Sequence, residues 1–161
     1  MITVNINGEE RQYPQGATYE DVANDYQEEY DNLIALAARD GKIRELFKKL
    51  TRDCELTFFT LKDDVGNKTY VRSATMLFLK AVFDVFGRET VQNCRVEFAI
   101  GNGSYISPKG KLNATEENAA KIRNRMRELV EAKTPFLKRS YSLDNAMELF
   151  RKEGRTDKET V

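Results

Sequence analysis

The fold of the first part of the chain is decided by residues 2–23, ITVNINGEERQYPQGATYEDVA. Within this stretch, residues 2–6 alternate between apolar and polar side chains, which is the period of a half-buried β-strand. Asn7-Gly8 follows at once and can adopt the positive φ angles of a type I′ turn. We therefore predict a β-hairpin whose return strand is 9–13.

The residues after this hairpin complete the pattern of a small domain. Thr18 precedes two acidic residues, as an N-cap precedes the first turn of a helix, and predicts a helix over 19–27. The sequence then predicts, in order, a strand at 33–38, a tight turn at Asp40-Gly41, a strand at 42–44, a helical or 3₁₀ turn at 46–50 and a strand at 53–61. This order fits a ubiquitin-like β-grasp sheet of about 60 residues, near the lower size limit for independent folding.

A different pattern begins after the polar, turn-rich stretch 62–67, which is typical of a domain boundary. Ser73 is placed to cap a helix that runs to residue 86, and Gly87 stands where a C-cap glycine belongs. The apolar side chains of this helix fall on one face, at Leu77, Phe78, Ala81, Val82, Val85 and Phe86.

Two strands and two helices follow. We predict a hairpin with strands at 91–100 and 104–107 around the turn 101–103, then a long helix at 116–133 capped by Asn113 or Thr115. The buried stripe of that helix is predicted at Ile122, Met126, Leu129 and Val130. Thr134-Pro135 ends the helix, 136–141 is extended, and Ser142 caps a last helix at 143–152 that Gly154 ends.

These elements predict an α+β protein with two folded parts. We expect a β-grasp domain at 1–61, a linker at 62–69 and a second α+β domain at 70–154. Residues 155–161 carry no core pattern and are expected to be a tail that leads to a further, C-terminal domain.

Composition excludes several classes of function. The 161 residues hold 26 basic and 26 acidic side chains, so the net charge is zero, unlike a protein that coats nucleic acid. The chain shows neither a signal-peptide pattern nor an apolar run long enough to span a membrane. We therefore expect a cytoplasmic protein that makes no membrane contact.

The absence of histidine narrows the possible chemistry further. Without histidine, the chain cannot form a Ser-His-Asp triad or a Cys-His nucleophile pair. Two cysteines, Cys54 and Cys94, cannot close a four-coordinate zinc site alone, so we expect no metal site. A reactive or metal-binding Cys94 is one interpretation, and a free thiol buried in a strand is the other.

Several short motifs occur in a recognisable order: Asn7-Gly8, Pro14-Gln15-Gly16-Ala17-Thr18, Asp21-Val22-Ala23, Asp40-Gly41-Lys42, Cys54-Glu55-Leu56, Arg72-Ser73-Ala74-Thr75-Met76-Leu77, Thr134-Pro135-Phe136 and Ala146-Met147-Glu148-Leu149-Phe150. On these motifs, residues 1–61 resemble a TGS domain, the β-grasp module found at the start of threonyl-tRNA synthetases and in some GTPases and stringent-response enzymes. Residues 70–150 are similar to the second N-terminal domain of those synthetases, which edits mischarged tRNA.

The chain departs from the synthetase motif at two positions. The synthetase family has His-Ser-Ala-x-His-Leu, and its two histidines fall at Arg72 and Met76. A guanidinium stays charged and a thioether does not titrate, so neither acts as a general base near neutral pH. The resemblance therefore implies the fold of the editing domain without its activity.

A bacterial group of uridine or nucleoside kinases also resembles the chain, through Tyr70-Val71-Arg72-Ser73 and the ending 150–158. That group carries the two modules without the histidines, ahead of a P-loop kinase domain. The P-loop signature is absent here, because Gly41-Lys42 and Gly110-Lys111 are followed by Ile43 and Leu112.

We therefore expect the non-catalytic binding or regulatory front end of a uridine (nucleoside) kinase. Its partner would be a C-terminal kinase domain, the only place where ATP and Mg²⁺ would be needed. The alternative is a tRNA-contacting N-terminal region of a threonyl-tRNA synthetase-like protein.

Two sets of residues are candidates for binding. Beside the Arg72 helix, an anionic small molecule or a tRNA phosphate could be held by a group comprising Arg72, Met76, Arg95 and Tyr105. The other interpretations are an ion pair of Arg72 or Arg95 with Glu97, and a plain hairpin turn at 101–105 instead of a phosphate-binding loop. RNA contacts are predicted at Lys42, Arg44, Lys48, Lys49, Arg123 and Arg127, where the alternative is an ordinary solvated surface.

Overall fold

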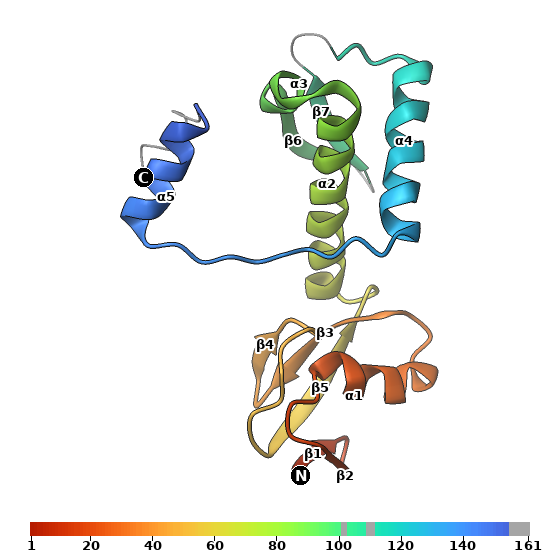
Figure 1. Cartoon of the computed structure of the whole chain (residues 1–161). Coiled ribbons are helices and arrows are strands. Elements are labelled where there is room, and N and C mark those ends of the chain that lie inside the picture. Colours follow the sequence, from red (N-terminus) through yellow and green to blue (C-terminus); the bar gives the residue numbers. More distant parts are fainter. Residues whose placement is uncertain (101–102, 109–111, 155–161) are drawn as a thin grey trace. The chain divides into compact units, whose positions relative to one another are not determined.

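The computed structural model describes residues 1–100, 103–108 and 112–154. Two compact units follow one another along the chain, Met1–Arg127 and Glu128–Val161. The protein is α+β, as predicted (Figure 1). Residues 101–102 of the predicted turn and the predicted tail at 155–161 lie outside the described residues.

A five-stranded mixed sheet forms the β-grasp part of the first unit. Its strands are β1 (Ile2–Ile6), β2 (Glu9–Tyr13), β3 (Ile34–Arg39), β4 (Lys42–Arg44) and β5 (Cys54–Thr60), in the spatial order β2-β1-β5-β3-β4. The central pair, β1 and β5, is parallel, and the other pairs are antiparallel. This topology confirms the predicted β-grasp sheet.

Two hairpin turns and one helix cap form as the sequence predicts. Asn7 and Gly8 have φ angles of 53° and 88°, as a type I′ turn requires, and Asp40-Gly41 repeats this pattern. Helix α1 (Tyr19–Tyr26) begins with a capping box, in which Thr18 Oγ1 accepts from the Asp21 N–H and the Asp21 carboxylate accepts from the Thr18 N–H. A 3₁₀ turn, η1 (Gln27–Glu29), follows α1.

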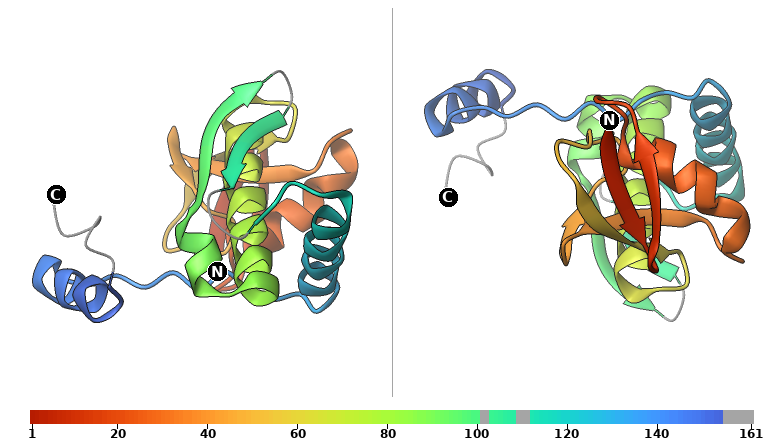
Figure 2. Two further views of the ribbon diagram at one scale, coloured as in Figure 1. Left: turned by 90° about the horizontal axis from the view of Figure 1, so that it is seen from above. Right: turned by 90° about the horizontal axis from the view of Figure 1, so that it is seen from below.

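Helix α1 and the sheet enclose a continuous core between them (Figures 1 and 2). Each fully buried aliphatic side chain contributes about 1.5–3 kcal/mol to stability. The core residues are Ile2, Val4, Ile6, Tyr13, Tyr19, Val22, Ala23, Tyr26, Ile34, Ala37, Leu50, Leu56 and Phe58.

Helix α2 spans Asp64–Phe86, so it begins earlier than the predicted start at Ser73. Residues 64–69 were expected in a linker but are helical. The reason is a tight turn between the end of β5 and α2, in which the Asp63 carboxylate accepts from the N–H and the hydroxyl of Thr60, at 2.7 and 2.9 Å. Gly87, with φ 84°, ends the helix as predicted. The division into domains at 61 and 70 stays a prediction.

A short helix, α3 (Arg88–Gln92), replaces the start of the strand predicted at 91. It lies against α2 through Thr90, whose hydroxyl donates to the Phe86 carbonyl. The strands β6 (Cys94–Ile100) and β7 (Gly103–Pro108) then form a separate two-stranded antiparallel sheet.

Helix α4 (Glu116–Glu131) runs beside α2 (Figures 1 and 2), where the Arg125 Nε donates to the Asp84 carboxylate at 2.9 Å. Thr115 caps α4 by accepting from the Asn118 N–H. Ile122 and Leu129 are buried as predicted, but the predicted core position Val130 is 60% exposed. Helix α5 (Leu143–Lys152), capped by Ser142, follows in the second unit.

Candidate functional site

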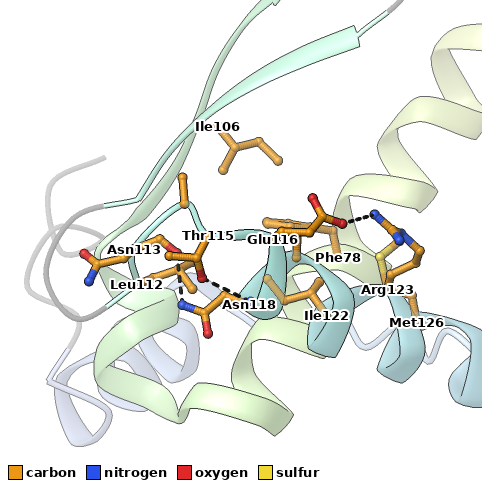
Figure 3. A pocket seen from close by; sticks show the side chains of 12 residues that line it. Phe78, Ile106, Leu112, Asn113, Thr115, Glu116, Asn118, Ile122, Arg123 and Met126 are labelled. Atoms are coloured by element: carbon orange, nitrogen blue, oxygen red, sulfur yellow. Dashed lines mark hydrogen bonds and ion pairs between the residues drawn. The ribbon is translucent and has the colours of Figure 1, made fainter.

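A cavity of about 490 Å³ opens in the first unit between α2, β7 and the first turns of α4 (Figure 3). Its apolar lining comes from three elements: Phe78 of α2, Ile106 of β7, and Ile122 and Met126 of α4. Leu112, which is 7% exposed, adds to this wall just before α4. Most of the wall is therefore suited to an apolar or aromatic group.

The polar side chains at the mouth of this cavity bind one another. Thr115 accepts from the Asn118 N–H at 3.2 Å, and the Asn118 side-chain amide donates to the Asn113 carbonyl at 3.0 Å. Arg123 lies 3.6 Å from the Glu116 carboxylate, as the dashed line in Figure 3 shows. Among the described residues that line the cavity, Thr115 carries the one hydroxyl and Glu116 the one carboxylate, and no thiol or histidine lies beside them.

The four residues predicted to hold an anion lie elsewhere. None of Arg72, Met76, Arg95 and Tyr105 lines the cavity. Arg72 and Arg95 are exposed, and Met76 and Tyr105 are 59% and 48% exposed. Within the described part of the chain, Glu97 forms no ion pair with either arginine, so the interpretation that such a pair closes a cleft is not supported.

Tyr105 instead forms an aromatic pair that the sequence analysis missed. Its ring stacks on Phe98 at a centroid distance of 5.3 Å. The register shifts between Val96 and Ala99, so two residues of β6 stand opposite one residue of β7. Such a β-bulge re-aims a side chain, and only the pairing of the strands could have shown it.

The predicted RNA-contacting cations fall into two groups. Lys48 and Arg123 form exposed ion pairs, Lys48 with Glu45 at 2.6 Å and Arg123 with Glu116. Among the described residues, Lys42, Lys49 and Arg127 have no ion-pair partner, and Arg44 donates only to the Ile43 carbonyl. Most cations of this set therefore form no ion pair within the described part of the chain.

The described residues show no metal cluster, and the pKa of both thiols is raised. No group of three or more His, Cys, Asp or Glu side chains lies together in the ranges that the structure covers. Burial raises the pKa of both the Cys54 and the Cys94 thiol, which keeps them protonated at neutral pH. No helix within the described ranges is long and apolar enough to cross a membrane.

Comparisons with known proteins identify what the chain is similar to. It is 29% identical over 149 residues to the threonine–tRNA ligase of Thermotoga maritima. The matched stretch covers 90% of this chain and 22% of the ligase. The corresponding ligase of Maricaulis maris is 28% identical over 159 residues, and that of Pelagibacter ubique is 24% identical over 155 residues. No family model matches the chain.

The chain thus spans 22% to 24% of the length of these relatives and is related to their N-terminal regions. This finding corrects the expectation of a uridine (nucleoside) kinase front end, because the relatives compared are threonine–tRNA ligases. The expected partner, a C-terminal kinase domain, is likewise not supported. The resemblance of the first 61 residues and of 70–150 to synthetase modules agrees with the comparison.

Proposed function

We propose that this chain contacts tRNA as the N-terminal region of a threonyl-tRNA synthetase-like protein and does not edit mischarged tRNA. The single observation that supports tRNA contact most strongly is the similarity to threonine–tRNA ligases over 90% or more of the chain. We further propose that this segment needs no cofactor.

The lack of editing is argued from the residues that stand where a catalytic base is needed. In the resemblance to the synthetases, Arg72 and Met76 stand where the family has its two histidines, and the chain holds no histidine at all. Neither side chain accepts a proton near neutral pH. Glu116, the one carboxylate among the described residues that line the cavity, lies 3.6 Å from the Arg123 guanidinium.

The surface that would meet tRNA is argued from charge. The net charge is zero, so phosphates are attracted most strongly where cations form no ion pair with a carboxylate. In the β-grasp part, Lys42 and Lys49 are such cations within the described residues, and both are exposed. Arg127 on α4 is a third.

The test is the salt dependence of tRNA binding by the full chain, measured by fluorescence anisotropy with a threonine tRNA transcript. The logarithm of the binding constant should fall linearly with the logarithm of the salt concentration, from about 50 to about 200 mM. The double variant Lys42→Ala/Lys49→Ala should bind more weakly and lower the slope by about 1.8 if each lysine neutralises one phosphate.

Lys62→Ala is the matched control, because Lys62 is also an exposed lysine without an ion-pair partner in the described residues. It should bind as the wild type does. Absence of binding at about 50 mM salt would overturn the proposed tRNA contact. An equal loss in the control would show that net charge, and not this surface, sets the affinity.

A further inference from the structure

We infer that Phe47 is a stacking platform for a base of single-stranded RNA, set in a basic loop beside the edge of the β-grasp sheet. This inference rests on the proposed function and adds a named surface and a recognition chemistry to it. The loop, Glu45–Leu50, follows the edge strand β4. The Phe47 side chain is 57% exposed, although phenylalanine is normally buried.

The loop is held rigidly against the start of α1. The Glu20 N–H donates to the Leu46 carbonyl at 2.8 Å, and the Tyr19 N–H donates to the Lys48 carbonyl at 3.0 Å. The Leu50 N–H donates to the Ala17 carbonyl at 2.7 Å. These three backbone hydrogen bonds fix the loop on both sides of Phe47.

The side chains on either side of Phe47 explain why it stays outside. Leu46 packs against the core and Leu50 is 3% exposed, so both anchor the loop from within. Because Leu46 and Leu50 point into the core, the Phe47 side chain lies in solvent on a backbone that is already ordered. A preordered aromatic ring loses little conformational entropy when a flat partner stacks on it.

The side chains around the Phe47 ring are mostly basic, which favours a polyanion as the binding partner. Residues 42–49 contain four basic side chains and one acidic side chain, Glu45, which is occupied by Lys48 at 2.6 Å. Lys42 and Lys49 have no ion-pair partner among the described residues. A surface that binds single strands combines two elements: cations that contact the phosphate backbone, and an aromatic ring on which a base stacks.

A single strand fits this surface better than a duplex does. In a duplex, bases are stacked on one another and their faces are not available to a side chain, whereas unpaired bases can be splayed onto an aromatic ring. Stacking of this kind is tolerant of sequence. The surface should therefore bind unpaired RNA without strong base preference.

The experiment uses the full chain, a fluorescein-labelled unstructured RNA of about 12 nucleotides, and inorganic polyphosphate as a base-free polyanion. Phe47→Ala should raise the Kd for the RNA roughly 5- to 150-fold, whereas Phe47→Tyr should stay near the wild type. Phe47→Ala should leave the affinity for polyphosphate and the salt slope unchanged. Lys49→Ala should weaken both ligands and lower the RNA salt slope by about 0.7.

Phe136→Ala is the matched control, because Phe136 is 59% exposed and stands outside the loop. The inference is overturned if Phe47→Ala binds the RNA as the wild type does, or if it loses RNA and polyphosphate equally. If the wild type binds the tRNA transcript while Phe47→Ala changes nothing, only this inference falls. If the short RNA binds through Phe47 and the tRNA does not bind, only the proposed function falls.

Discussion

Replacing Gly66 by alanine should destabilise the protein, even though alanine is the better helix former by about 1 kcal/mol. Gly66 lies in the first turn of α2, where a Cβ atom would stand 2.0 Å from the carbonyl oxygen of Thr60. Real Cβ contacts are not shorter than 3.0 Å, so the helix or the strand end would have to move by about 1 Å.

The obstacle cannot move freely. The Thr60 carbonyl accepts from the Asp63 N–H at 3.1 Å, and the Thr60 N–H and hydroxyl donate to the Asp63 carboxylate. Overpacking against fixed backbone costs up to about 3 kcal/mol, which leaves a net loss of about 2 kcal/mol after the helix-propensity gain. That loss corresponds to a fall in Tm of about 4–8 °C for a chain of this size.

Urea denaturation followed by circular dichroism measures this change. Asn67→Ala is the matched control, since Asn67 is exposed and lies on the same turn of α2. The control should unfold at the wild-type midpoint or slightly above it. A Gly66→Ala midpoint equal to or higher than that of the wild type would refute the argument from close approach.

Three further predictions concern α2 and β6. Lys80 and Arg125 lower the pKa of Asp84 below its ordinary 3.8, so Asp84→Asn should reduce stability by about 1 kcal/mol near neutral pH. The difference between the variant and the wild type should disappear as the pH falls through the folded-state pKa of Asp84, and urea midpoints measured across this pH range check it. Cys94 is 9% exposed with a raised pKa, so it should react with a thiol reagent only at the rate of unfolding, as reaction kinetics in native buffer and in urea would show. Arg72→Ala should weaken tRNA binding and lower the salt slope by about 0.9 if this exposed cation contacts a phosphate. An unchanged slope would show that Arg72 contacts no phosphate of the tRNA.

Local sequence signals predicted the β-grasp part well, because its turns and caps are set within a few residues. Asn7-Gly8 fixes one hairpin through its own φ angles, and Thr18 with Asp21 fixes the start of α1. The start of α2 was placed too late, since its first residues have turn-like composition and Gly66 is required by Thr60, a partner outside the helix.

The candidate sites needed spatial information that the sequence does not carry. The cavity joins Phe78, Ile106 and Ile122, three positions far apart in the chain, and no single motif brings them together. Phe47 was within reach of sequence reasoning, because it stands in a short stretch, 42–49, that holds four basic side chains and one acidic side chain. Its exposure, however, follows from the anchoring of Leu46 and Leu50, which only the fold reveals.

The central claim, tRNA contact without editing, is tested most directly by the deacylation rate of mischarged tRNA at protein concentrations that saturate binding. The account predicts that anisotropy reports a bound tRNA while the amino acid is lost at the same rate as in a protein-free blank, because Arg72 and Met76 supply no base. Deacylation faster than the blank, or no binding of the tRNA at any protein concentration, would contradict it.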